Sequence, residues 1–220
     1  VESSVVFYNA VSSALEKACT GLGQQPARGA SFWELASLLL HELPLKGLLP
    51  DAVSFNAVVS ACEKDGAWEQ ALQVFDCLRR FAGPTTTSVN ALISACARGF
   101  RWDVAIAMFT EMQVSNKLQA DIITYSAVIS ACEKGLQWEK ALALLDDLAW
   151  PEKSDSCEGI KPDLILCNAV ISACEKGQQW QKALWLLHLL QRYGPPPDAV
   201  SYGAAISACA EGQAWRWSLW

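Results

Sequence analysis

The sequence predicts an all-α fold, a solenoid of tandem helix-turn-helix repeats of about 35 residues each. Three observations favour this fold. One phrase, close to Asn-Ala-Val-Ile-Ser-Ala-Cys, returns six times along the 220 residues, apolar residues in each unit recur at helical spacing, and the period-2 alternation of strands is absent. Successive phrases start 47, 34, 36, 42 and 35 residues apart. They open at Asn9, Asn56, Asn90, Ser126, Asn168 and Gly203.

The first half of each unit is predicted to be one helix that contains the phrase. In the fifth unit, Val170, Ile171 and Cys174 share one side of this helix, which we expect to face the core. A glycine follows the helix and is expected to stop it. The glycines are Gly66, Gly99, Gly135, Gly177 and Gly212. Three of the first helices follow a Pro-Asp pair, at Asp51, Asp163 and Asp198.

The second half of each unit is predicted to be an amphipathic helix that starts at a tryptophan. In the second unit, Trp68, Ala71, Leu72, Phe75 and Leu78 form the stripe expected of such a helix. Because the tryptophan belongs to this stripe, we expect it to pack between repeats as core rather than to stack on nucleobases. The matching tryptophans of the other units are Trp33, Trp102, Trp138, Trp180 and Trp215.

Two units are longer than the others, and each is expected to hold an inserted surface loop. The insertions lie at 19–29 and 151–159, in stretches that are rich in Gly, Gln, Pro or charge. The expected units of this single array are 5–51, 52–85, 86–121, 122–163, 164–198 and a partial 199–220. We expect the chain to be a piece of a longer array.

Composition argues against several other classes of protein. Hydrophobic residues make up 52% of the chain and charged residues only 18%, which suits repeats that bury their surface against neighbours. No apolar run is long enough to span a membrane, so no membrane partner is expected. Nucleotide-binding loops and the zinc signatures of proteases and deaminases are missing, so we expect no enzymatic activity.

The nine cysteines do not predict a metal site. Five of them recur at one position on the apolar side of the first helix, where they would act as small hydrophobic residues. The chain has no Cys-x-x-Cys pair, and its two histidines, His41 and His188, lie in different units. No metal and no cofactor is expected. The five recurring cysteines are Cys62, Cys96, Cys132, Cys174 and Cys209.

A polar ridge recurs along the first helices. It consists of the opening residue, a serine four positions later and a basic residue four positions after that, a spacing that keeps all three on one helix face. Stacked ridges would form a groove in which an amide meets a base edge and a cation meets a phosphate. A solvated helix face is the alternative. The ridges are Asn9, Ser13, Lys17; Asn56, Ser60, Lys64; Asn90, Ser94, Arg98; Ser126, Ser130, Lys134; and Asn168, Ser172, Lys176.

These motifs resemble those of the pentatricopeptide repeat family, right-handed α-solenoids that bind single-stranded RNA at one base per repeat. The resemblance covers residues 5–215. It rests on Asn-Ala-x-Ile-Ser-Ala-Cys after an aromatic or apolar residue, on Glu-Lys-Gly, on Ala-Leu-x-Leu-Leu in the second helix and on the closing Pro-Asp. The main rival is a tetratricopeptide-like scaffold that binds protein or peptide partners.

The resemblance implies that each base is read by the opening residue of a phrase together with the last residue of the same repeat. The pairs are Asn9 with Asp51, Asn56 with Thr85, Asn90 with Asp121, Ser126 with Asp163, and Asn168 with Asp198. In the family, Asn with Asp favours uracil, Ser with Asp favours guanine and Asn with Thr leans to pyrimidines. The implied preference is near 5′-U-Y-U-G-U.

Two further residue sets follow from the same resemblance. Residues that would clamp each base are Val6, Val53, Thr87, Ile123, Ile165 and Val200. Residues that would approach phosphates are Lys17, Lys64, Arg98, Lys134 and Lys176. Gly203 and Glu211 depart from the pattern, so the last unit is expected to read no base. The net charge of −6 is opposite to that of a typical RNA binder, and modest affinity is expected.

The resemblance also implies a biological setting. It places the protein in the chloroplast or mitochondrion and implies RNA processing, editing, stabilisation or translation control. Because the array itself offers no catalytic residues, any catalysis would come from protein partners or from a further domain.

Overall fold

The computed structural model describes residues 32–45, 50–81, 83–115, 118–148 and 160–212. These residues form ten helices and no strand, in agreement with the predicted all-α class. They belong to two compact units, and the boundary between the units falls after Leu118 in the sequence. The residues of the first predicted helix and of both insertions, with Cys19 and Cys157, lie outside the described ranges.

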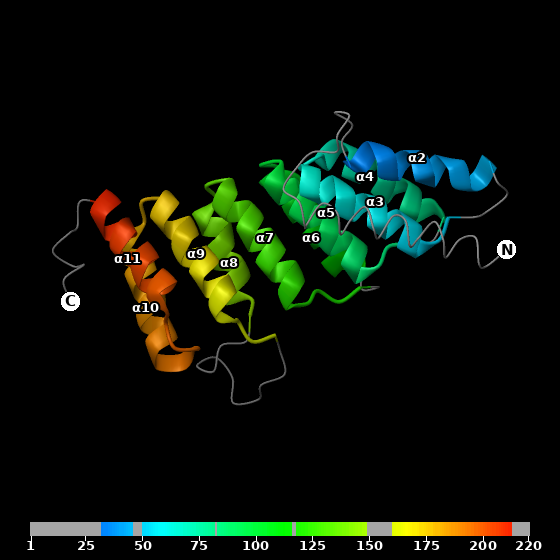
Figure 1. Ribbon diagram of the computed structural model, residues 1–220. Helices are drawn as coiled ribbons and strands as arrows, with labels where there is room; N and C mark the ends of the chain where they lie inside the picture. Colours follow the sequence, from blue (N-terminus) through cyan, green and yellow to red (C-terminus); the bar gives the residue numbers. More distant parts are fainter. Residues whose placement is uncertain (1–31, 46–49, 82, 116–117, 149–159, 213–220) are drawn as a thin grey trace. The chain divides into compact units, whose positions relative to one another are not determined.

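The first unit contains α2 to α6. The helices are α2 (Phe32–Leu45), α3 (Ala52–Asp65), α4 (Trp68–Phe81), α5 (Thr86–Arg98) and α6 (Trp102–Ser115). The first helices α3 and α5 pack on each other, and α4 contacts both of them. Helices α3 and α4 thus form a helical hairpin whose second helix also touches α5 of the next repeat (Figure 1).

The second unit repeats this arrangement with α7 to α11. The helices are α7 (Ile122–Lys134), α8 (Trp138–Asp146), α9 (Leu164–Lys176), α10 (Trp180–Tyr193) and α11 (Ala199–Glu211). The first helices α7, α9 and α11 pack in chain order, α8 contacts α7 and α9, and α10 contacts α9 and α11.

Every first helix starts at a side-chain cap. The N-cap side chain accepts a hydrogen bond from the backbone N–H three residues later, which satisfies a donor that the helix itself leaves free. This explains why an aspartate so often stands between the proline and the helix. The caps are Asp51, Thr85, Asp121, Asp163 and Asp198.

The glycines end the first helices as expected, but most of them do so without the left-handed backbone that favours glycine. Only Gly66 adopts the left-handed conformation, with φ 69°, whereas φ of Gly99 is −79°. The left-handed residue in three of the other repeats is the next one along: Phe100, Leu136 and Gln178 have φ of 57°, 58° and 56°. Most of these glycines are therefore not required by backbone conformation.

Close contact with the preceding repeat explains the glycines. A Cβ on Gly99 would lie 2.2 Å from Cδ1 of Trp68, and on Gly177 or Gly212 it would lie 2.4 Å from Cδ1 of Trp138 or Trp180. The recurring Trp of one repeat thus packs directly against the recurring Gly of the next repeat. The tryptophans pack between repeats as expected, but they are only partly buried, so they seal the edge of the core rather than fill its centre.

The five cysteines in register are buried on the first helices, as expected. Burial raises the pKa of the Cys62 thiol to about 12 and that of Cys96 to about 11, so these thiols stay protonated and behave as small apolar groups. Within the described residues, no three His, Cys, Asp or Glu side chains gather where they could hold a metal ion. Every helix in these ranges is too short or too polar to cross a bilayer.

Candidate nucleic-acid interface

The second residue after each N-cap is exposed in both units. Val53 is 57% exposed, Ile123 61%, Ile165 74% and Val200 62%, and Thr87 occupies the same position on α5. These are the described members of the expected base-clamping set, since Val6 lies outside the described residues. A β-branched side chain held in solvent at the same place in every repeat is not needed by the core.

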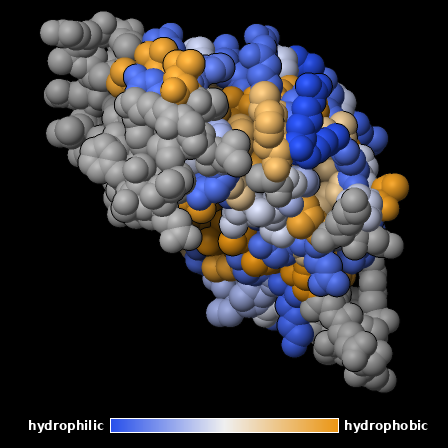
Figure 2. All heavy atoms as spheres, turned by 90° about the vertical axis from the view of Figure 1, so that its right-hand side faces the viewer, coloured by the Kyte–Doolittle hydropathy of each residue, from blue (hydrophilic) through white to orange (hydrophobic). Residues whose placement is uncertain are grey.

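Exposed apolar residues alone do not identify an interface. In the view of Figure 2, hydrophobic side chains lie at the surface in several patches among hydrophilic ones. Phe81 and Val114 on second helices are as exposed as the clamp residues. What separates the clamp set from these others is its regular position beside the helix caps.

One expected base-reading pair is in direct contact. In the second unit, Asn168 Nδ2 donates a hydrogen bond of 3.2 Å to Asp198 Oδ1, although the two residues belong to neighbouring first helices, α9 and the cap of α11. Ser201 Oγ donates to Asn168 Oδ1 at 2.6 Å. Each polar atom of the Asn168 amide is thereby held, and one N–H of Nδ2 remains for a ligand.

The carboxylate of this pair is kept ionised by its surroundings. The backbone N–H of Ser201 donates to Asp198 Oδ1 at 2.9 Å, and the amide of Asn168 donates to the same oxygen at 3.2 Å. These donors, the backbone N–H above all, lower the pKa of Asp198 from its ordinary value. The pair therefore presents an anionic acceptor beside a neutral donor.

The corresponding pair in the first unit is joined indirectly. Asn56 Nδ2 lies 3.5 Å from Thr87 Oγ1, and Thr87 Oγ1 shares a hydrogen bond of 2.8 Å with Thr85 Oγ1. The Asn56 Oδ1 atom is buried and, within the described residues, has no hydrogen-bond partner. The hydroxyl of Ser88 donates to the Thr85 carbonyl instead.

The remaining pairs are placed only in part. Ser126 and Asp163 both lie in the second unit, where Asp163 Oδ1 accepts from the backbone N–H of Leu166 at 2.8 Å. Asn90 is buried, at 8% exposure, and Asp121 caps α7 in the other unit. Asp51 caps α3, and its partner Asn9 lies outside the described residues.

The basic ends of two ridges, Arg98 and Lys176, form contacts between repeats. Lys176 Nζ lies 2.9 Å from Glu133 Oε1, and Ser172 Oγ donates to the same oxygen at 2.8 Å. In the first unit, Arg98 donates to the Lys64 carbonyl at 3.3 Å. Lys134 is half-buried on α7, and Lys17 lies outside the described residues. The ridge of α9 is thus partly neutralised by a carboxylate from the preceding repeat.

Two features of this surface were not predicted from the sequence. One is the pairing of Glu133, which stands next to Lys134 in the chain, with Lys176, 43 residues away. The other is the hydroxyl three residues after four of the five caps, buried in Ser54, Ser88, Thr124 and Ser201. The recurrence of Ser or Thr at this one position of the first helix was the signal in the sequence that could have identified it.

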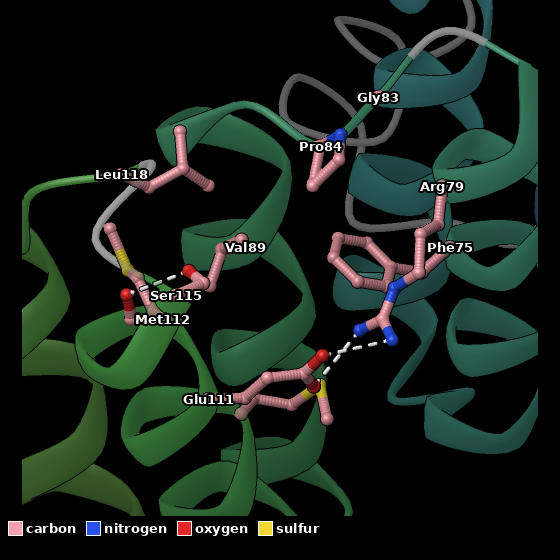
Figure 3. A pocket seen from close by; sticks show the side chains of 10 residues that line it. Phe75, Arg79, Gly83, Pro84, Val89, Glu111, Met112, Ser115 and Leu118 are labelled. Carbon is pink, nitrogen blue, oxygen red and sulfur yellow. Dashed lines mark hydrogen bonds and ion pairs between the residues drawn. The ribbon is translucent and has the colours of Figure 1, made fainter.

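A pocket in the first unit is lined by none of the base-reading residues. Its volume is about 450 Å³, and Phe75, Pro84, Val89 and Met112 contribute apolar surface. Figure 3 shows the guanidinium of Arg79 turned toward the carboxylate of Glu111, with which it forms an ion pair of 2.9 Å. This pocket lies mainly on second helices and their loops.

Comparison with known proteins gives a family match. The family model of the PPR repeat matches residues 53–81, 87–116, 123–149 and 165–195, more than half of the chain. Each match begins at one of the exposed clamp positions. No curated protein matches the sequence.

Solved structures of the pentatricopeptide repeat protein PPR10 are similar to this chain. The crystal structure of the maize protein is 18% identical with a TM-score of 0.71, and the match covers 83% of this chain and 25% of that one. The crystal structure of PPR10 in complex with an 18-nt psaJ RNA element is 26% identical with a TM-score of 0.70, covering 96% and 28%. The chain therefore spans about a quarter of the length of these relatives.

Proposed function

The chain belongs to the pentatricopeptide repeat family, and we propose that it binds single-stranded RNA with its repeat array, one base per repeat. The observation that carries the proposal is the contact between Asn168 and Asp198. It joins two residues 30 positions apart into one donor-acceptor pair, beside the exposed side chain of Val200. The similarity to an RNA complex of PPR10 supports the same reading.

The chemistry of this pair suits uracil. The free N–H of the Asn168 amide can donate to a uracil carbonyl, while the ionised Asp198 accepts from the ring N–H beside that carbonyl. Cytosine has an acceptor in place of that ring N–H, which would face the carboxylate unfavourably. Apolar neighbours such as Ile165 and Val200 would cover the base from either side.

The remaining pairs extend this proposal to a sequence preference near 5′-U-Y-U-G-U. Asn9 with Asp51, Asn90 with Asp121, and Asn168 with Asp198 are assigned to uracil. Asn56 with Thr85 is assigned to a pyrimidine, and Ser126 with Asp163 to guanine. Val6, Val53, Thr87, Ile123, Ile165 and Val200 are proposed to clamp the bases.

Phosphate contacts are proposed for Lys17, Lys64, Arg98, Lys134 and Lys176, with unequal strength. Lys176 already shares its charge with Glu133, so a phosphate must compete with that carboxylate. Together with the net charge of −6, this supports modest affinity from the described repeats.

We further propose that the array selects an RNA in a chloroplast or mitochondrion for processing, editing, stabilisation or translation control. Binding is its own contribution, and catalysis would come from protein partners. A scaffold for peptides remains the competing function, and the 450 Å³ pocket of the first unit is the surface that such a scaffold would offer.

A titration with random single-stranded RNA at several salt concentrations tests the proposal. RNA binding predicts a linear fall of log affinity with log salt, with a slope of about −0.7 for each phosphate contact. The variant in which Lys64, Arg98, Lys134 and Lys176 are all changed to Gln should bind every RNA more weakly and with a shallower slope. Absence of salt-dependent RNA binding by the folded parent would favour the peptide scaffold.

A further inference from the structure

The residue three positions after each cap follows the identity of the base-reading residue in the preceding repeat. Where the preceding repeat opens with Asn, this residue carries a hydroxyl: Ser54, Ser88, Thr124 and Ser201 follow Asn9, Asn56, Asn90 and Asn168. Where the preceding repeat opens with Ser126, it is Leu166. All five are buried, at 3% exposure or less.

Helix capping alone does not account for this pattern. Asp163 caps α9 through the backbone N–H of Leu166, so a first helix forms without a hydroxyl at this position. Leu166 is also fully buried, which shows that the site accepts an apolar side chain. The hydroxyl is therefore not essential to the start of the helix, although Ser54 Oγ and Thr124 Oγ1 each donate to their own cap carboxylate at 2.8 Å. Its presence coincides with an Asn in the preceding repeat.

The second unit shows how such a hydroxyl contacts the Asn of the preceding repeat. Ser201 Oγ accepts from the backbone N–H of Asp198 at 3.2 Å and lies 2.6 Å from Asn168 Oδ1 and 3.0 Å from Asp198 Oδ1. A hydroxyl has one proton, and the shorter distance directs it to the Asn168 amide. A serine side chain such as that of Ser126 has no amide that could be turned the wrong way.

We propose that Ser201, through its buried hydroxyl, is a positioning residue that fixes the amide of Asn168 with its N–H toward the base. The inference rests on the proposed RNA-binding function. With Oδ1 held by Ser201 and one N–H held by Asp198, Asn168 can offer only a donor to the ligand. Uracil, whose carbonyl accepts, is selected by that orientation.

The first unit shows the contrasting state. Ser88 Oγ donates to the Thr85 carbonyl at 2.8 Å and not to Asn56, whose Oδ1 is buried without a partner in the described residues. The amide of Asn56 is therefore held at one end only, by Thr87. We expect this repeat to discriminate between bases less sharply than the repeat of Asn168.

Loss of the hydroxyl is tested by Ser201→Ala, with Ser201→Thr as the conservative variant. Competition between oligomers that end in 5′-UUUGU and 5′-UUUGC, embedded in longer RNA, reports the base read by Asn168. Ser201→Ala should lower the preference for U by roughly two- to tenfold, the range of one hydrogen bond, while Ser201→Thr retains it. A purely structural role would weaken binding to both RNAs alike, and that result would overturn the inference.

Gain of the hydroxyl is tested in the fourth repeat. Ser126→Asn supplies an amide beside Leu166, which lacks the hydroxyl, so this change alone should remove the preference for G but create little preference for U. Combined with Leu166→Ser, it should create the full preference for U. Ser126→Asn with Leu166→Ala is the matched control, because it removes the same apolar volume without adding a hydroxyl. Equal preference for U in all three variants would overturn the inference.

A measurement without RNA separates this inference from the proposed function. The side-chain amide protons of Asn168, followed by NMR in the free protein, should shift and lose protection from solvent exchange in Ser201→Ala but not in Ser201→Thr. Failure of the parent to bind RNA would remove the proposed function and, with it, the assigned role in base selection. Unchanged Asn168 amide signals in the folded Ser201→Ala variant would remove the positioning contact itself.

Discussion

Two repeat junctions in this protein share the same packing but differ in their polar chemistry. At the junction of α3 with α5, Asn56 reaches the cap Thr85 only through Thr87. At the junction of α9 with α11, Asn168 contacts the cap Asp198 directly. The helices pair in the same way at both. The fold therefore fixes where the two residues stand, whereas the amide is held differently by a Thr cap and by an Asp cap.

The largest expected effect comes from disrupting the close contact between a tryptophan and the glycine of the next repeat, which both junctions contain. Gly99→Ala and Gly212→Ala each place a Cβ within 2.4 Å of a tryptophan of the preceding repeat. We expect each to lower the free energy of unfolding by roughly 1 to 3 kcal/mol, because the tryptophan must move out of a filled contact. Denaturant unfolding measures this change.

Gly203→Ala is the matched control for these two variants. A Cβ on Gly203 would meet no atom within 4 Å, and the residue lies inside α11. Because alanine favours helix over glycine, the control should gain about 0.5 to 1 kcal/mol. Equal loss of stability in all three variants would show that the Trp contact is not what requires glycine.

Converting one junction into the other should have a smaller effect, confined to one base. Thr85→Asp gives the first junction the cap of the second, so the amide of Asn56 gains an anionic acceptor. We expect the preference for U over C at the second base to rise by roughly two- to tenfold, as one hydrogen bond allows. Competition between 5′-UUUGU and 5′-UCUGU measures it. Thr85→Asn, which keeps a capping side chain without the charge, should leave the ratio near that of the parent.

The smallest expected effect concerns the basic end of the second junction. Glu133→Gln removes the carboxylate that holds Lys176, so RNA affinity should rise by roughly two- to fivefold, the scale of an exposed ion pair. The salt slope should steepen by about 0.7 if Lys176 gains one phosphate contact. Glu139→Gln makes the same change of charge on α8, away from the ridge. A gain of equal size in that control would assign the effect to net charge alone.

The sequence allowed the all-α repeat fold to be predicted, because the fold depends on periodicity. The pairing of Asn168 with Asp198 was implied by the family resemblance alone, and the two side chains are in contact. The glycines follow the first helices, as predicted, but the close approach of Trp68 to Gly99 was not predicted. A residue that recurs once in every repeat looks the same in the sequence whether it serves its own helix or a contact with the neighbouring repeat.

The ion pair of Lys176 illustrates the same limit in electrostatics. Glu133 follows Cys132 in the chain and resembles any acidic residue on a helix surface. Its partner becomes evident only when α7 and α9 are packed side by side, which brings Ser172 and Lys176 to one carboxylate oxygen. Similarly, Ser201 resembles an ordinary member of a capping box until Asn168 is seen against it.

The contact between Asn168 and the start of α11 has a consequence for how such arrays can be rebuilt. A repeat folds as one hairpin, but the proposed base-reading group is divided between that hairpin and the first turn of the next one. The proposed unit of recognition is therefore offset from the unit of folding. A hairpin exchanged by recombination or by an engineer would alter the base read at its own position and also the one read by its upstream neighbour. Transplants cut just after the first turn, beyond Ser201, would carry a whole reading group with them.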